Sequence, residues 1–496
     1  MMNARGLILF FTAFALGLTV CIGGKPSDID NSKLLHDLGE RRTRVMRKME
    51  GQSMMVLFSA DHQIYSRDIS YKFNQENNLY YLTGINQHGT RLVLMPQNTH
   101  HREILFIPDV DPVEKFWTGS VLSPEEARRI SGIDNVWSVS KFMPFINSIL
   151  HNRPHRTDSH AKSNEYLYFA NALERETAKI YLLSDSQKKV TDKFDFEDLL
   201  KKRFPSVDIK DAHPIFHGLR VTKSQYEIEQ IQKAIDITAT AHLEVMRKIL
   251  PGNWEYEIEA LIEYIFKKNG SLGWAFPFIV ASGPNTTTLH YDKSSRQIRN
   301  GELLLVDIGA EYNQYTSDIT RTIPCNGKFS PEQAEIYQLV LDAQTAAMQL
   351  VRPGSSISTI HRQAVDTIKD GLLRLGLITN KEGDQYRVFF PHGTIHFLGL
   401  DVHDVGSGKY LSAGMIFTVE PGIYVRQDSL ERLLKIGMQE DQVAIVRSHL
   451  ERYMSIGVRI EDDVLVTEEG YKNLSKSVPS QIQAIQMLMS TERIDH

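Results

Sequence analysis

The chain has 496 residues, of which 42% are hydrophobic and 24% charged, and its formal net charge at pH 7 is −5. This length exceeds what a single hydrophobic core normally serves, so two domains are expected. The ordinary composition indicates a globular protein, and the small net charge gives no indication of a nucleic-acid partner.

The first 24 residues differ in composition from the rest of the chain. Arg5 precedes an uncharged apolar run from Leu7 to Val20, which is short for a membrane span and typical of a signal peptide. Two alternatives remain open, namely cleavage near Gly23 and a lipoprotein in which Cys21 carries a lipid anchor. Both predict an exported protein, either periplasmic or secreted. Because no later apolar run approaches membrane length, no membrane span is expected.

Residues 25–220 are expected to form an α/β domain, because strand-like and helix-like segments alternate along them. The domain opens with a basic helical stretch whose charges, including those of Arg41 and Arg42, are expected to lie on the surface. The strand-like segments are 53–59, 79–82, 91–95 and 103–108. The helix-like segments are 123–130 and 142–150.

Residues 221–480 repeat one structural plan about 100 residues apart. Ser224 and Glu227 form a capping box at the start of the first long helix. The paired helices are expected at 224–250, 258–268, 331–352 and 357–375. Strands with two acidic residues follow each pair. This repetition predicts an internal duplication, in which a pseudo-symmetric fold brings both sets of strands to the centre. Residues 481–496 remain as a C-terminal tail.

The acidic residues of this domain lie in strand-like segments. Asp307 ends an apolar run, and a buried carboxylate is unfavourable unless it is paired or bound to a metal ion. Asp318 follows in an alternating segment, so a hairpin would bring both carboxylates to one face. In the second half Glu420 ends a strand, and Arg459 and Glu461 are two residues apart on another strand.

The balance of charge predicts a metal centre. Four inward carboxylates require compensation, and two divalent cations would supply it. Carboxylates with one imidazole, drawn from closely spaced histidines such as His396 and His403, suit Mn²⁺, Co²⁺, Fe²⁺ or Zn²⁺. Two such ions lower the pKa of a shared water toward about 7. The neighbouring Asp462 and Asp463 are expected to be surface turn residues.

In this order the motifs resemble those of the pita-bread metallopeptidases, specifically the Xaa-Pro aminopeptidases (aminopeptidase P) and prolidases. The resemblance is carried by Val306-Asp307-Ile308-Gly309, Ser317-Asp318-Ile319-Thr320-Arg321-Thr322, His392-Gly393-Thr394-Ile395-His396, Leu400-Asp401-Val402-His403-Asp404, Thr418-Val419-Glu420-Pro421-Gly422 and Gly457-Val458-Arg459-Ile460-Glu461. Residues 78–84 and 116–119 resemble the creatinase-like N-terminal domain more loosely. The implied fold is a creatinase-like α/β domain (25–220) followed by a pseudo-two-fold pita-bread domain (221–480).

The resemblance also implies roles for individual residues. The implied ligands of two divalent ions, with Mn²⁺ expected and Co²⁺, Zn²⁺ or Fe²⁺ as alternatives, are Asp307, Asp318, His396, Glu420 and Glu461. Asp318 and Glu461 would bridge the ions, and Glu420 would also be the general base toward the attacking water. His290 and His403 would lie near the scissile amide. The implied residues of the proline pocket are His392, Tyr424 and Arg459.

Three functions remain open. The expected one is an Xaa-Pro aminopeptidase, whose substrates are peptides with proline as the second residue. The connection between Glu420 and Glu461 differs in length from the family pattern, so a prolidase, which cleaves only dipeptides, is an alternative. A metal-free binding module on the same fold is more remote. The resemblance further implies a homodimer or homotetramer.

Overall fold

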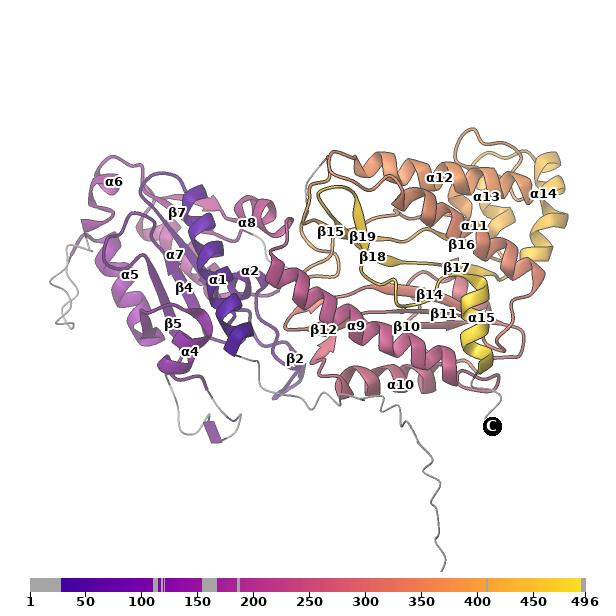
Figure 1. The fold of residues 1–496 in the computed structure, drawn as a ribbon. Coiled ribbons are helices and arrows are strands. Elements are labelled where there is room, and N and C mark those ends of the chain that lie inside the picture. The colour runs from indigo at the N-terminus through magenta and orange to yellow at the C-terminus, as the bar shows by residue number, and fades with distance from the viewer. Residues whose placement is uncertain are drawn as a thin grey trace, which may run out of the picture.

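The computed structural model describes residues 28–109, 115–116, 119, 121–153, 167–184, 188–406 and 409–491. The predicted signal segment therefore lies outside the described residues. The described chain forms two α/β lobes that lie side by side (Figure 1). Within these ranges, no helix has the length and apolar character needed to cross a membrane.

The N-terminal lobe is built on a six-stranded mixed sheet in the order β6-β5-β4-β1-β7-β8. Its strands are β1 (Ser53–Phe58), β4 (Arg91–Leu94), β5 (Glu103–Ile107), β6 (Val136–Ser138), β7 (Lys179–Leu182) and β8 (Asp208–Asp211). A separate hairpin pairs β2 (Ile64–Ser66) with β3 (Ile69–Ser70). The helices are α1 (Asp28–Lys48), α2 (Asn77–Thr83), α4 (Pro124–Ser131), α5 (Phe142–Leu150), α6 (Ala170–Glu174), α7 (Thr191–Arg203) and α8 (His213–Arg220). The predicted α/β class is thereby confirmed.

The prediction of a strand at 79–82 is wrong, because these residues lie in α2. The side chain of Glu76 accepts a hydrogen bond from the amide of Leu79 and caps the helix at its start. Gly84, at φ 66°, ends it in the left-handed conformation. The apolar and aromatic side chains between the caps suit a strand or a helix equally, so the caps decide the conformation.

The prediction that Arg41 and Arg42 lie on the surface is also wrong, since both are buried. Arg41 donates a hydrogen bond to the carbonyl of Tyr81 at 3.0 Å. Arg42 donates to the carbonyls of Leu82 at 2.9 Å and Ser131 at 3.0 Å. These carbonyls lie at the C-terminal ends of α2 and α4, where a buried guanidinium satisfies groups that have no partner within the helix.

The C-terminal lobe confirms the predicted helix pairs, α9 (Gln225–Lys248) with α10 (Glu255–Lys268) and α11 (Pro331–Met348) with α12 (Ile357–Arg374). The strands of both halves lie between the two pairs (Figure 1). The first half contributes β9 (Gly273–Trp274), β10 (Ile279–Ser282), β11 (Leu303–Ile308), β12 (Ala310–Tyr312), β13 (Tyr315–Thr316) and β14 (Ile319–Pro324). The second contributes β15 (Ile416–Val419), β16 (Gly422–Tyr424), β17 (Gly457–Arg459), β18 (Asp462–Val466) and β19 (Tyr471–Asn473).

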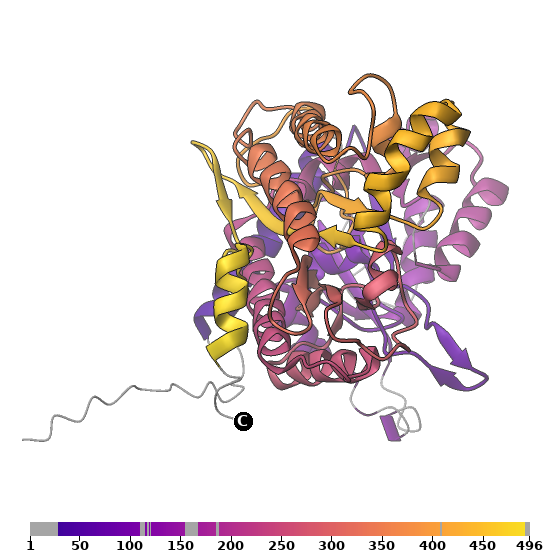
Figure 2. The same ribbon diagram turned by 90° about the vertical axis from the view of Figure 1, so that its right-hand side faces the viewer.

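Shorter elements complete this lobe. They are the 3₁₀ turns η3 (Gly283–Thr287) and η4 (Gln385–Val388) and the helices α13 (Ser429–Lys435), α14 (Glu440–Tyr453) and α15 (Ile482–Thr491). Helices α13 and α14 occupy the connection between Glu420 and Glu461. Turned by 90°, the molecule shows this lobe in front of the N-terminal one (Figure 2).

Hydrogen bonds join the two halves along β14 and β17. The hydroxyl of Thr322 donates to the carbonyl of Arg459 at 3.0 Å, and the amide of Glu461 donates to the carbonyl of Thr320 at 3.1 Å. Arg321, which is 1% exposed, donates to the carbonyl of Glu461 at 2.6 Å. The junction of the halves is therefore also the place where their acidic residues meet.

The expectation that Asp462 and Asp463 are surface turn residues is wrong, because both are buried in β18. Asp462 accepts hydrogen bonds from Arg321 at 2.7 Å and Gln344 at 3.0 Å. Asp463 accepts one from the backbone amide of Asp318 at 3.1 Å. A run of acidic residues resembles a solvated turn in sequence, whereas here Arg321 and Asp318 of the other half, together with Gln344 of the same half, supply buried partners.

Candidate metal centre

The carboxylates of both halves converge on one cavity of about 580 Å³ in the C-terminal lobe. The predicted site residues that line it are His290, Asp307, Asp318, His392, His396, His403, Glu420, Arg459 and Glu461. Tyr424, the remaining predicted residue, is fully buried and lies behind this lining. A cavity of this volume is typical of sites for small ligands and short peptides.

The register of β11 and β14 places the first two carboxylates on one face. Asp307 pairs with Thr320, and Asp318 is two residues before Thr320, so both acidic side chains point to the same side of the hairpin. Gly309 lies between them, where an added Cβ would be 1.9 Å from the carbonyl oxygen of Ser317. Only glycine therefore permits this close approach of the two strands.

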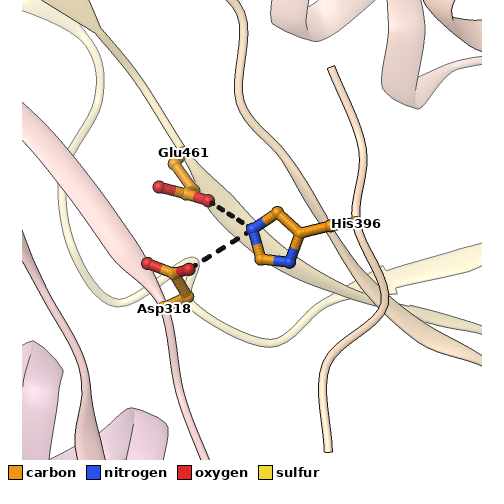
Figure 3. Close-up of side chains that lie close together, drawn as sticks. All are labelled: Asp318, His396 and Glu461. Atoms are coloured by element: carbon orange, nitrogen blue, oxygen red, sulfur yellow. Dashed lines mark ion pairs between the residues drawn. The ribbon is translucent and has the colours of Figure 1, made fainter. Parts of the chain in front are cut away.

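Asp318, His396 and Glu461 point toward one another (Figure 3). The Nε2 atom of His396 lies 3.4 Å from a carboxylate oxygen of Asp318 and 3.6 Å from one of Glu461. One possible ligand atom from each of these residues lies within 4.8 Å of the others. The three side chains are therefore close enough to share a metal ion.

Glu420 joins the group from the end of β15. Its Oε1 atom lies 3.6 Å from Nε2 of His396, and its backbone amide donates to the carbonyl of Thr394 at 2.9 Å. The amide of Thr418 donates to the carbonyl of His396 at 2.9 Å. The segment that carries His396 therefore runs beside β15, which explains why two distant motifs reach one point.

Burial and mutual repulsion perturb the acidic groups of the cavity. Burial, followed by the charges of Glu461 and Asp307, raises the pKa of Asp318 well above its ordinary value. Burial and the charge of Glu461 raise the pKa of Glu420 to about 8. Burial opposes ionisation of Glu461 as well, but His396 and Arg459 outweigh it and lower its pKa. Without bound cations, the carboxylates of the cluster reduce their mutual repulsion by taking up protons.

The residues present fit divalent cations. Among the predicted ligands, three buried carboxylate oxygens have no hydrogen-bond partner, namely Oδ1 of Asp307, Oδ1 of Asp318 and Oε1 of Glu461. Oδ1 of the neighbouring Asp463 is in the same state. An orphaned buried carboxylate oxygen is strongly unfavourable unless a cation or a donor satisfies it. Four carboxylates and one imidazole are also donors that first-row divalent metals accept.

Arg459 and Tyr424 form a hydrogen-bonded support for the cluster. Arg459 donates to Oδ2 of Asp307 at 2.5 Å, to the hydroxyl of Tyr424 at 2.9 Å and to the hydroxyl of Thr320 at 3.2 Å. Tyr424 also contacts His392, with its hydroxyl 2.9 Å from Nε2. Burial and the nearby Arg459 lower the pKa of His392 to about 4, so this ring is neutral at pH 7.

His290, between β10 and β11, and His403, before β15, are both exposed and both line the cavity. The ring of His403 stands edge-on to that of His396, with centroids 4.4 Å apart. Burial, followed by the neighbouring His396, lowers the pKa of His403. His290 follows η3 and is exposed to solvent. Both side chains can therefore reach a ligand placed over the carboxylates.

The sequence analysis missed an apolar part of the lining. The cavity is also lined by Phe276, Pro277, Ile279, Leu289 and Val402. Ile279 begins β10, Phe276 and Pro277 precede that strand, and Leu289 and Val402 adjoin His290 and His403. Only for Leu289 and Val402 did the sequence offer a signal, namely their place beside those histidines. They add apolar surface to a lining that is otherwise mostly polar or charged.

Comparison with known proteins agrees with this arrangement. Residues 229–468 match the model of metallopeptidase family M24, and residues 38–157 match the aminopeptidase P N-terminal domain. An Xaa-Pro aminopeptidase of Haemophilus influenzae is 35% identical over 461 residues, covering 91% of this chain and 96% of its own. Human Xaa-Pro aminopeptidase 3 is 30% identical, covering 90% and 83%.

Solved structures show the same similarity. Aminopeptidase PepP of Pseudomonas aeruginosa superposes with a TM-score of 0.78 at 31% identity, covering 94% of this chain and 99% of its own. A variant of Escherichia coli aminopeptidase P in complex with substrate gives 0.77 at 31% identity, covering 92% and 99%. The chain therefore belongs to metallopeptidase family M24, together with the Xaa-Pro aminopeptidases. Membership implies a peptidase that acts on peptides with the aid of divalent metal ions.

Proposed function

We propose that this chain removes the N-terminal residue from peptides whose second residue is proline. The observation that carries the proposal is the convergence of four carboxylates and one imidazole, three of whose carboxylate oxygens have no hydrogen-bond partner, on one cavity whose lining also includes apolar residues. Relatives that carry the name Xaa-Pro aminopeptidase cover nearly the whole chain.

Asp307, Asp318, His396, Glu420 and Glu461 would hold two divalent ions, for which we propose Mn²⁺, with Co²⁺, Zn²⁺ or Fe²⁺ as alternatives. When bound, such ions polarise the scissile carbonyl and acidify the attacking water. Carboxylate oxygens of Asp318, Glu420 and Glu461 lie 3.4–3.6 Å from Nε2 of His396, which supports a shared ion, and the family resemblance implies that Asp318 and Glu461 would be the two shared ligands. The carboxylate of Glu420 would take the proton of the attacking water and pass it to the leaving nitrogen.

The remaining residues would bind and orient the substrate. His290 and His403, which line the same cavity as the carboxylates, would donate hydrogen bonds to the oxygen of the scissile amide as its charge develops. His392 and Arg459, held by Tyr424, would shape the pocket for the proline ring. Proline has no amide hydrogen, so a peptidase for this bond must recognise the shape of the ring instead.

Hydrolysis of Arg-Pro-Pro by the metal-loaded enzyme, followed by chromatography of the products, tests this proposal. We expect free arginine and Pro-Pro, and we expect Glu420→Gln to lower kcat by at least about 10²-fold, because general acid–base catalysis contributes 10²- to 10⁴-fold. Glu431→Gln, an exposed glutamate of α13, is the matched control and should be fully active. Cleavage of Gly-Pro alone would favour a prolidase, and cleavage of neither peptide would refute both.

We also propose export and self-association. The apolar run before Cys21 supports a signal segment, cleaved or lipidated, and mass spectrometry of the mature N-terminus would refute this if the whole segment were retained. Exposed Ile64, Tyr65, Ile69 and Tyr71 on the β2–β3 hairpin support a homodimer or homotetramer. A monomeric mass in light scattering at micromolar concentration would contradict the second proposal.

A further inference from the structure

The connection that carries His290 has little regular structure. It runs from the end of β10 at Ser282 to the start of β11 at Leu303, and only the short turn η3 is regular within it. His290 itself is exposed. A side chain at the mouth of a cavity is useful in catalysis only if its backbone is held, because small displacements of a reacting or stabilising group are costly.

One buried carboxylate holds this connection at several points. Glu255, the first residue of α10, is 0% exposed. Its Oε1 atom accepts hydrogen bonds from the amide and hydroxyl of Ser282, both at 2.7 Å, and from the side chain of Asn285 at 3.0 Å. Its Oε2 atom accepts from the hydroxyl of Tyr291 at 2.8 Å and from the amide of Arg296 at 2.9 Å.

The five donors span the segment on both sides of His290. Ser282 and Asn285 precede the histidine, while Tyr291 and Arg296 follow it. Tyr291 is its immediate neighbour and itself lines the cavity. The backbone amide of Glu255 also donates to the carbonyl of Arg296 at 3.0 Å, which ties the far end of the segment to the start of α10.

The segment that carries His290 is also fastened by hydrogen bonds that do not involve Glu255. Arg296 already fastens the segment through its guanidinium, which donates to Glu302 at 2.6 Å and to the hydroxyl of Ser282 at 2.8 Å. Glu255 adds the one contact that reaches the cavity lining, namely its bond with Tyr291. This bond limits the rotation of the backbone immediately after His290.

We infer that Glu255 is a positioning residue for the peptidase reaction, acting through Tyr291 to hold the imidazole of His290 over the carboxylate cluster. This inference rests on the proposed function, in which His290 contacts the scissile amide. Glu255 does not touch the substrate, so its contribution should disappear when the imidazole is absent. This dependence on the imidazole of His290 distinguishes a positioning role of Glu255 from a general effect on folding.

A double-mutant cycle on Arg-Pro-Pro hydrolysis tests the inference. Glu255→Gln replaces one acceptor oxygen by a donor that faces two or three donors. We expect it to lower kcat by about 10- to 100-fold with little change in KM. In a His290→Ala background the same substitution should cost less than about threefold, because no imidazole remains to be misplaced. Glu259→Gln, further along α10, is the control and should match the wild type.

Tyr291→Phe keeps four of the five hydrogen bonds that Glu255 accepts. It therefore tests the same connection from Glu255 to His290 even if Glu255→Gln folds poorly. We expect a smaller loss in kcat, again confined to enzyme that retains His290. Equal losses with and without His290, or no loss in either single variant, would overturn the inference. Failure of the wild type to cleave the peptide would instead overturn the proposed function, on which the inference rests.

Discussion

The close approach of the strands that carry Asp307 and Asp318 limits which residue can occupy position 309. Gly309 separates the strands of Asp307 and Asp318, and a methyl group there would overlap the carbonyl oxygen of Ser317 and press on Phe276. Phe276 lines the cavity, and Ser317 directly precedes the proposed ligand Asp318. The position is therefore expected to matter for stability and for metal binding together.

Gly309→Ala should lower the free energy of unfolding by about 1–3 kcal/mol, as overpacking of a dense core does. It should also weaken binding of Mn²⁺, because the strands of Asp307 and Asp318 must move apart. Gly218→Ala in α8 is the matched control, since an added Cβ meets nothing within 4 Å and alanine favours a helix. Thermal denaturation with and without Mn²⁺ measures both effects, and a Gly309→Ala variant with wild-type values would contradict the account.

Among the elements, the connection between His396 and β15 is held by buried charges. The side chain of Asp404, which is 1% exposed, accepts hydrogen bonds from Arg220 at 2.5 Å and Lys223 at 3.0 Å. Arg220 also donates to Asn78 of the N-terminal lobe at 2.9 Å. The residue next to His403 is thus tied to the other lobe, so the two lobes together determine where this histidine lies.

The charge of Asp404 should make stability depend on pH. Burial alone would raise the pKa of Asp404, but Arg220 and Lys223 outweigh it and hold the pKa below its ordinary value. The unfolded chain, with a pKa near 3.9, therefore binds more protons than the folded one below about pH 4, and stability falls there as pH decreases.

Asp404→Asn should remove this part of the pH dependence, giving a shallower loss of stability below about pH 4. At pH 7 it should cost about 3–5 kcal/mol, because Arg220 and Lys223 lose their buried partner. Urea unfolding between pH 3 and 7 measures both effects. Asp198→Asn, which breaks an exposed pair with Lys202, is the control and should change stability by less than about 1 kcal/mol. An equally small change for Asp404→Asn would contradict this interpretation.

Elements with clear local signals could be predicted from the sequence. The capping box at Ser224 identified the start of α9, and α11 begins at Pro331 as predicted, because a helix terminus is specified by its own neighbours. Helix α2 was not predictable in this way, since its cap Glu76 is an uncommon one. The burial of Arg41 and Arg42 was not predictable either, because their acceptors lie at the ends of helices distant in sequence.

In the whole molecule, duplication predicted the convergence of the four carboxylates, while the roles of the histidines, Tyr424 and Arg459 came from the family resemblance. Each half repeats a helix pair followed by acidic strands, so the position of the cavity followed from symmetry. The burial of Asp462 and Asp463 depends on Arg321, Gln344 and the backbone of Asp318, which only the assembled lobe brings near them. The role inferred for Glu255 likewise depends on contacts across more than 25 residues of chain.

The central claim is that the converging carboxylates form a two-metal peptidase centre. The most direct measurement is titration of chelator-treated enzyme with Mn²⁺, following bound metal by mass spectrometry and cleavage of Arg-Pro-Pro in the same samples. We predict no cleavage before metal is added and full activity when about two ions are bound per chain, as in two-metal hydrolases. Full activity of the metal-free enzyme, or saturation without bound metal, would contradict the account.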